Sequence, residues 1–200
     1  MFTLWQRYGL SGLLYIAVCK IYTALFFSRA RMIRLPFDIR QRGNIRLGNN
    51  FTCGKYCRIE AYPESLDEKN KIITFGENVQ INDAVHIVGR KKVTIGNNVL
   101  IASKVFISDS NHGSYSGDNQ SSPDEPPALR KLQATPVTIE DNVWIGEFVT
   151  ILQGVTIGRG SIIGSLSVVS KDIPANSIAV GSPARVIKQY NFGTKRWEKV

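Results

Sequence analysis

The stretch VTIEDNVWIGEFVTILQGVTIGRGSIIGSLSVVSKD, residues 137–172, repeats one pattern every six residues. Most hexads begin with an aliphatic residue, carry a second aliphatic residue two positions later, and then supply a turn. The hexads start at Val137, Val143, Val149, Val155, Ser161 and Ser167. A period of six fits neither the 3.6-residue turn of a helix nor the eight-to-twelve-residue spacing of hairpin strands.

The repeat extends toward the N-terminus in three earlier sets, which start at Val93, Ile73 and, more weakly, Ile45. Three hexads supply three short strands and three turns, which close one triangular coil with its aliphatic side chains inside. One coil cannot bury its own face, so stability requires that coils stack. Glycines such as Gly76 and Gly96 follow the second aliphatic residue, where a corner excludes larger side chains. The repeat therefore predicts an all-β solenoid.

The longest interruption of the repeat follows ISDSNH, residues 107–112. The next hexad is expected at 111 and starts at Val137, and the intervening segment is rich in Pro, Ser, Gly and Asn. An insertion must leave such a stack at a corner, so we expect an extruded loop near 110–136, with the insertion itself at 111–136. Long loops in compact domains are usually functional. His112, one of only two histidines, lies where this loop begins.

An apolar segment, YGLSGLLYIAVCKIYTALFF at 8–27, has about the length that spans a bilayer. The following ALFFSRARM is a poor signal-peptide cleavage site, and a transmembrane helix would bury Lys20 at a cost of about 3 kcal/mol. An amphipathic helix at the membrane surface fits better. Its apolar stripe would comprise Leu10, Leu13, Leu14, Ala17, Val18, Ile21 and Leu25. A helix that packs on its own domain or on a partner subunit produces the same pattern.

Positive charge is concentrated at the N-terminus. The net charge is +9, and residues 1–46 carry eight Lys or Arg against one acid, Asp38. Such clustering does not fit a nucleic-acid-binding surface, but it suits anionic lipid headgroups. We therefore expect residues 1–42 to form a basic amphipathic helical segment, with peripheral membrane association through residues 1–34.

The cysteines, Cys19, Cys53 and Cys57, are odd in number and spaced neither as a disulfide framework nor as a zinc site. We expect packing roles for all three, in a reducing compartment, and no bound metal.

Residues 43–190 resemble the hexapeptide-repeat acyltransferases. The resemblance is most specific in ISDSNH with its loop, in NVWIG at 142–146, and in VVSKDIPANSIAVGSPARVIK at 168–188. It implies a left-handed parallel β-helix at 43–182 and a homotrimer with active sites between subunits, and we expect a short C-terminal helix or tail at 183–200. Within the family, the layout is most similar to sugar O-acetyltransferases of bacterial surface polysaccharides, which use acetyl-CoA.

The resemblance implies that His112 is the general base. A sugar hydroxyl is a poor nucleophile at neutral pH, and a positioned imidazole that removes its proton accelerates transfer by about 10²–10⁴-fold. The other ring nitrogen needs an acceptor, which Asp109, Asn111 or a backbone carbonyl could supply.

Further positions carried over from the family line the two substrates. For the acceptor sugar these are Asn82, Asp83, His86 and Trp144. For coenzyme A they are Trp144, Gly146, Ser165, Ser170, Lys171, Arg185 and Lys188. The amide after Gly146 is a candidate oxyanion donor, although Glu147 stands where the family often has a small residue. The last three cations would bind the phosphates of coenzyme A.

Four functions compete. The leading hypothesis is O-acetylation of a sugar in O-antigen, capsule or exopolysaccharide, or in its lipid-linked precursor, in the cytoplasm or on the cytoplasmic face of the inner membrane. N-acetylation of an amino-sugar nucleotide would use the same base and donor. A metal-dependent relative would need three histidines from two subunits, whereas this chain has only His86 and His112. A non-catalytic solenoid subunit is the fourth.

Overall fold

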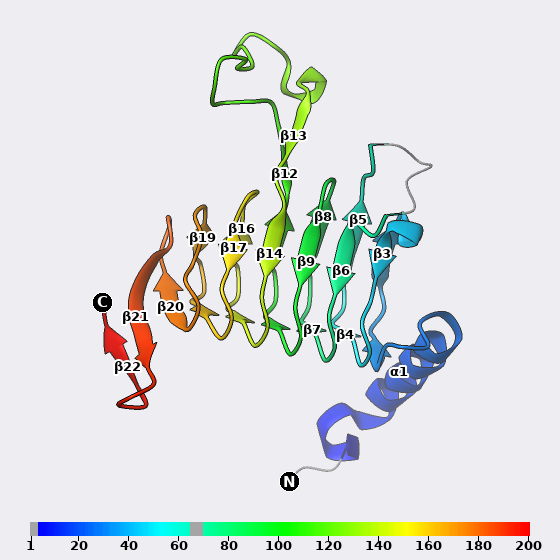
Figure 1. Ribbon diagram of the computed structural model, residues 1–200. Helices are drawn as coiled ribbons and strands as arrows, with labels where there is room; N and C mark the ends of the chain where they lie inside the picture. Colours follow the sequence, from blue (N-terminus) through cyan, green and yellow to red (C-terminus); the bar gives the residue numbers. More distant parts are fainter. Residues whose placement is uncertain (1–3, 65–69) are drawn as a thin grey trace.

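The computed structural model describes residues 4–64 and 70–200 and consists of a stack of short β-strands with a helix at its N-terminal end (Figure 1). Three parallel sheets form the stack, and we call them sheets A, B and C. Sheet A contains β1 (Met32–Ile33), β4 (Thr52–Cys53), β7 (Gln80–Ile81), β10 (Leu100–Ile101), β15 (Trp144–Ile145), β18 (Ile162–Ile163) and β20 (Ser177–Val180). Sheet B contains β2 (Phe37–Arg40), β5 (Cys57–Ala61), β8 (His86–Gly89), β11 (Phe106–Ser108), β16 (Thr150–Ile151) and β19 (Val168–Val169). Sheet C contains β3 (Ile45–Arg46), β6 (Ile73–Phe75), β9 (Val93–Ile95), β14 (Val137–Ile139) and β17 (Thr156–Ile157).

The chain passes through sheets A, B and C in turn, so each coil contributes one strand to each sheet. Inward residues align in columns, and one column in sheet A reads Ile81, Ile101, Ile145 and Ile163. These side chains are at most 1% exposed. Burial of each contributes roughly 1.5–3 kcal/mol relative to exposure, which explains why the hexad repeats an aliphatic residue at this position.

Polar ladders and close backbone contacts hold the corner between sheets C and A. Asn50, Asn78, Asn98 and Asn142 adopt positive φ there, and their side-chain amides bond from one coil to the next at 3.0–3.3 Å. A Cβ atom on Gly48 would lie 1.9 Å from the next coil's backbone oxygen. Glycine is required at this position for close approach.

The insertions leave the stack at the corner between sheets B and C. After β11, the chain forms an antiparallel hairpin of β12 (Ser110–His112) and β13 (Leu132–Ala134), with a 3₁₀ turn, η2 (Pro127–Leu129), in the loop between them. Figure 1 shows this hairpin projecting well beyond the stack. The predicted extruded loop near 110–136 is present, although its two ends pair as strands.

Helix α1 (Leu4–Phe26) is interrupted at Gly9, which has φ 61°. Its Cys19 and Thr23 are buried against the first coil, whereas the predicted stripe, from Leu10 to Leu25, faces away from it. The prediction of an amphipathic helix is wrong, because the face opposite the stripe is also largely apolar and packs on the protein. The predicted helical segment 1–42 is too long, since β1 and β2 already belong to the stack.

The first coil was missed because Arg31 stands in register with Phe51, where later coils have aliphatic residues. Met32 and Arg34 donate their N–H groups to the carbonyls of Phe51 and Cys53 at 3.4 and 3.3 Å, as the corresponding residues of later coils do, so the backbone pattern persists without the side-chain signal. A 3₁₀ turn, η1 (Arg42–Asn44), then leads into β3. The stack thus begins near residue 32 rather than 43.

The C-terminal helix expected at 183–200 is also wrong. Strands β21 (Arg185–Asn191) and β22 (Arg196–Lys199) form an antiparallel hairpin that extends sheet A. Burial along β21 alternates with period two, as a strand requires. The ring of Tyr190 packs across the hairpin at 5.3 Å from Trp197.

Candidate active site

The predicted base, His112, ends strand β12 and is exposed beside the extruded loop. Its backbone carbonyl accepts a hydrogen bond from the hydroxyl of Tyr115. Arg130 holds that hydroxyl with Nη1 at 2.9 Å, and its other nitrogens donate to loop carbonyls, including that of Glu125 at 3.0 Å. The loop beside His112 is therefore braced by one guanidinium.

Asp109 has a different role from the predicted one. Its side chain is fully buried, and its two carboxylate oxygens accept the backbone N–H groups of Arg90, Lys91 and Lys92 at 2.7–2.8 Å. Asp109 thus fixes the turn of the preceding coil at the point where the insertion leaves. Its carboxylate is committed to the scaffold rather than to the ring of His112.

Asn111 precedes His112 in β12, so the two side chains point to opposite faces of the hairpin. The side-chain oxygen of Asn111 is buried and has no hydrogen-bond partner among the described residues. Asn111 is therefore badly placed to hold the His112 ring. Of the three acceptors that the sequence suggested for the second ring nitrogen of His112, a backbone carbonyl is the one that the structure leaves.

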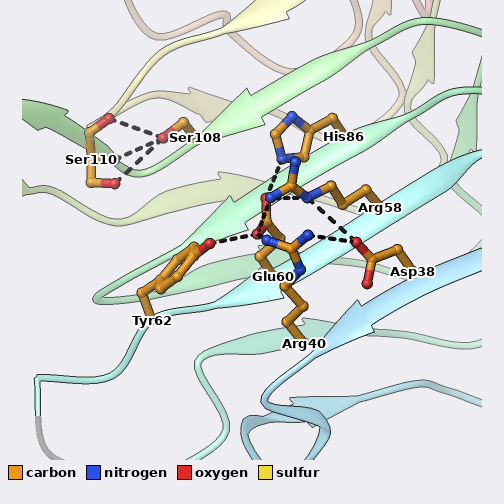
Figure 2. A network of polar contacts seen from close by, with 8 residues as sticks. All are labelled: Asp38, Arg40, Arg58, Glu60, Tyr62, His86, Ser108 and Ser110. Carbon is orange, nitrogen blue, oxygen red and sulfur yellow. Dashed lines mark hydrogen bonds and ion pairs between the residues drawn. The ribbon is translucent and has the colours of Figure 1, made fainter.

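A polar cluster covers the outward face of sheet B near the base of the hairpin, where Ser108 and Ser110 also bond to each other (Figure 2). We call it the Glu60 network, and it comprises Asp38, Arg40, Arg58, Glu60, Tyr62 and His86. The Glu60 side chain is 2% exposed and lies 2.9 Å from Arg40 Nη1 and 2.6 Å from Arg58 Nε. The Tyr62 hydroxyl donates to it at 2.5 Å.

Burial of Glu60 favours its neutral form, yet hydrogen bonds from Tyr62, His86 and Arg58 and the charge of Arg58 outweigh that effect and lower its pKa to about 2. The carboxylate is therefore ionised at neutral pH and can only accept hydrogen bonds. His86 Nε2, 2.7 Å from Glu60 Oε1, must donate. The other ring nitrogen of His86 has no hydrogen-bond partner among residues 4–64 and 70–200, and the side chain is 35% exposed.

Of the predicted acceptor-binding residues, His86 lies on sheet B, whereas Asn82 and Asp83 lie at the corner between sheets A and B. The ring of His86 is 5.3 Å from that of Phe106, its outward neighbour on β11. Asp83 accepts the N–H of Lys55 at 2.8 Å, and the Asn82 side chain accepts from Gln80 at 3.1 Å.

The predicted donor residues begin on sheet A. Trp144 projects outward from β15 and is 50% exposed, as its place in the hexad predicted. Gly146 follows at the corner between sheets A and B, and a Cβ there would lie 2.6 Å from the backbone nitrogen of Ser165. The candidate oxyanion donor is not free, because the N–H of Glu147 donates to the Ser165 hydroxyl at 3.1 Å.

Two of the predicted phosphate-binding cations, Arg185 and Lys188, lie on β21 in sheet A. Lys188 shares an outward column with Trp144, through Ile162 and Ile178. Ser170 and Lys171 are exposed at the corner between sheets B and C. None of the three cations is in an ion pair with a carboxylate of residues 4–64 or 70–200.

The structure thus brings the predicted residues together in two groups. His112 and Lys171 lie at the corner between sheets B and C, whereas Trp144, Gly146 and Ser165 lie on sheet A and at its corner with sheet B. Sheet B separates them within one chain. Among the described residues, no group of three His, Cys, Asp or Glu side chains is placed to hold a metal.

Of the Glu60 network, the sequence predicted a role only for His86. The sequence does contain an indication of this network, because two pairs of oppositely charged residues occur at alternate positions: Asp38 with Arg40, and Arg58 with Glu60. Strands β2 and β5 place these in register, so that opposite charges face each other. The assignment of residues 1–42 to a helical segment concealed the pairing.

Comparison with known proteins gives two kinds of match. The family profile described as bacterial transferase hexapeptide (six repeats) matches residues 136–171. Over 195 residues, 97% of this chain and 96% of the relative, the chain is 46% identical to an Escherichia coli protein named as a lipopolysaccharide biosynthesis O-acetyl transferase. It is 41% identical to the galactoside O-acetyltransferase of Escherichia coli over 165 residues, 81% of this chain and 75% of that protein.

Solved structures agree on the architecture. A Bacillus cereus N-acyltransferase in complex with dTDP-4-amino-4,6-dideoxyglucose and coenzyme A superposes with a TM-score of 0.67 over 83% of each chain, and at 23% identity this likeness concerns the fold alone. A hexapeptide-repeat acetyltransferase of Vibrio cholerae, complexed with acetyl coenzyme A, is 30% identical with a TM-score of 0.55, over 76% of this chain and 74% of that one.

Proposed function

We propose that this chain, which belongs to the hexapeptide-repeat acyltransferases, transfers acetyl from acetyl-CoA to a sugar hydroxyl of a bacterial surface polysaccharide or of its lipid-linked precursor. The observation that carries the proposal is an exposed imidazole, His112, where the extruded hairpin leaves the coil stack. The whole-length relative named for lipopolysaccharide O-acetyl transfer supports this acceptor class.

We propose further that the coils wind as a left-handed parallel β-helix. The stacking of short strands in three parallel sheets supports this fold, as do the similarity to hexapeptide-repeat acetyltransferases and the turns with positive φ at the corners.

In the proposed reaction, His112 removes the proton of the sugar hydroxyl as the oxygen attacks the thioester carbonyl carbon. A new carbon–oxygen bond forms, and the carbon–sulfur bond then breaks. The imidazolium returns its proton to the departing coenzyme A sulfur, so the base is regenerated. Acid–base assistance of this kind contributes about 10²–10⁴-fold.

The donor site that we propose runs along sheet A. Trp144 and Lys188 are three strand spacings apart, or about 14 Å. An extended coenzyme A could contact Trp144 near its thioester and reach Arg185 and Lys188 with its phosphates. Ser165 would contact the chain between them, while Ser170 and Lys171 belong to a different corner.

We propose that the enzyme is a homotrimer whose sites lie between subunits. The separation of His112 from Trp144 by the width of sheet B supports this assembly. One chain presents the base at the corner between sheets B and C, and the donor surface on sheet A. A second copy that sets its sheet A corner against the hairpin would unite them.

The Glu60 network is our proposed surface for the acceptor, together with Asn82 and Asp83. Sugars are recognised by planar polar side chains and by stacking on rings. His86 offers a ring nitrogen that has no partner in the described part of the chain, and Phe106 and Tyr62, which contact His86 and Glu60 respectively, are 36% and 44% exposed. The network lies on sheet B, which also contains β11, the strand that leads into the β12–β13 hairpin with His112.

The test is acetyl transfer from acetyl-CoA by the full chain, with hydroxyl and amine sugars offered free, nucleotide-linked and lipid-linked. We expect His112→Ala to reduce turnover by about 10²–10⁴-fold with an unchanged melting temperature. Asn119→Ala, in the same loop, is the matched control. Wild-type turnover in His112→Ala would refute an acid–base role, and a preference for amines would favour N-acetylation instead.

We also propose that the enzyme works in the cytoplasm and associates peripherally with the inner membrane through residues 1–34. The basic N-terminus and the exposed apolar face of α1 support this location.

A further inference from the structure

A cavity of about 390 Å³ opens where the C-terminal end of α1 meets the first coil. Its floor is apolar, since Phe27 and Ile45 are buried and Ile39 and Leu47 are half-buried. Phe26, the last residue of α1, also lines the cavity and is 52% exposed. The cavity is therefore continuous with the exposed face of the helix.

Four cations surround this floor, and no acidic residue is among the described lining residues. They are Arg29, Arg42, Arg46 and Lys71. Arg42 donates to the Phe26 carbonyl and lies 4.3 Å above the ring of Phe27. None of the four pairs with a carboxylate in the part of the chain that the structure describes.

The exposed face of α1 is long and apolar. Leu14, Ile21 and Leu25 are 60%, 62% and 71% exposed. By length and hydropathy the segment Trp5–Phe26 could cross a membrane, and only 11% of its most apolar window is buried in the protein. Such a face favours contact with hydrocarbon over contact with water.

Contacts with the first coil hold the C-terminal half of α1 against the protein. The Tyr15 hydroxyl donates to the Leu35 carbonyl at 2.8 Å, and the N–H of Ile33 donates to the Thr23 hydroxyl at 2.8 Å. Of the described helix, residues 4–14 extend beyond these contacts, and 11 helical residues span about 16 Å, roughly half of the hydrocarbon core. In this arrangement the helix presents its exposed apolar face to a lipid surface.

We infer that this cavity binds the phosphate of an anionic lipid, while α1 lies in the surface of the bilayer. The cations suit a phosphate group, and the apolar floor suits the hydrocarbon attached to it. A lipid phosphate is a ligand that accounts for both features of the cavity. The inference deepens the proposed membrane association and is independent of acetyl transfer. An anionic phospholipid and a lipid-linked sugar phosphate share this chemistry.

The experiment measures binding of the full chain to vesicles of phosphatidylcholine alone and of phosphatidylcholine with phosphatidylglycerol. We expect Arg29→Gln/Arg46→Gln to weaken binding to the anionic vesicles by about 30-fold. The matched control, Lys195→Gln/Arg196→Gln, removes the same charge at the far end of the stack and should change binding less than 3-fold, by the same estimate.

Inorganic phosphate and a short-chain polyprenyl phosphate, added as competitors, separate the two ligand sources. Competition by the prenyl phosphate alone supports a lipid-linked phosphate, and competition by neither supports a bilayer phospholipid. Equal binding of the cavity variant and the control, or of neutral and anionic vesicles, would overturn the phosphate site. Displacement by inorganic phosphate alone would show that the cavity binds a free phosphate rather than a lipid. Larger oligomers without vesicle binding would also contradict the lipid site, because they would assign the exposed face of α1 to a second copy of the chain.

Discussion

The carboxylate of Glu60 is almost completely buried, yet its pKa is lowered to about 2 from an ordinary value of 4.5. A group whose pKa is lower in the folded state stabilises the protein above the unfolded pKa, and this contribution is lost as the pH falls through the folded pKa. The contribution of Glu60 should therefore be complete above about pH 4.5 and disappear toward pH 2.

We expect Glu60→Gln to lower the free energy of unfolding at pH 7 by about 1.5–3 kcal/mol, the usual contribution of a hydrogen bond to a charged group. The deficit should shrink at pH 3, because the Glu60 carboxyl of the unfolded chain, with its ordinary pKa of 4.5, is then protonated while that of the folded protein is still mostly ionised. Urea unfolding at both pH values measures this, with exposed Asp124→Asn as the control. A deficit of equal size at pH 3 and pH 7 would contradict the assignment.

Asp109 gives the second prediction for a single residue. Asp109→Asn replaces one of the two accepting oxygens with an NH₂ group that faces backbone N–H groups, so we expect a loss of about 3 kcal/mol. Thermal and urea unfolding measure the loss. Turnover per folded molecule should fall far less than in His112→Ala. A stable Asp109→Asn protein without activity would restore the catalytic role that the sequence suggested.

Among the elements, the strand corners depend on residues that can approach a neighbouring backbone. A Cβ on Gly48 would lie 1.9 Å from the Gly76 oxygen, whereas one on Gly43 would meet nothing within 4 Å. We expect Gly48→Ala to destabilise the protein by about 1–3 kcal/mol, as overpacking does, and Gly43→Ala to be neutral. Similar denaturation midpoints for the two variants would show that the corner relaxes.

The same elements show how far the sequence can predict this fold. Paired aliphatic residues such as Val143 and Ile145 identify a buried strand because burial demands them in every coil. The first coil escaped detection because a strand paired through its backbone tolerates Arg31 at a column position. The C-terminal hairpin escaped because Arg185–Asn191 alternates only weakly between exposed and half-buried residues.

The candidate site is less predictable for a related reason. Asp109 and Asn111 lie within three residues of His112, but strand alternation and the turn at 90–92 decide where their side chains point. The Glu60 network depends on register between β2 and β5, which becomes visible only when both strands are recognised. Proximity along the chain is therefore a poor guide to proximity in the site.

For the whole molecule, the separation of His112 from Trp144 leads to a test by mixing subunits. We consider a trimer in which each site takes the base from one subunit and the donor surface from its neighbour. His112→Ala lacks the base, and Trp144→Ala/Arg185→Ala lacks the donor surface. In random mixed trimers, a site is complete only when both contributing subunits carry the required wild-type half, which gives about a quarter of all sites.

Co-expression of the two inactive variants should therefore restore roughly a quarter of wild-type turnover by this reasoning, whereas each variant alone remains inactive. Mixing after separate purification, without exchange of subunits, provides the control and should restore nothing. If His112 and Trp144 instead belonged to one site within a single chain, no mixed assembly would contain a complete site. Turnover would then stay at the level of the separate variants, and the arrangement of sites between subunits would be wrong.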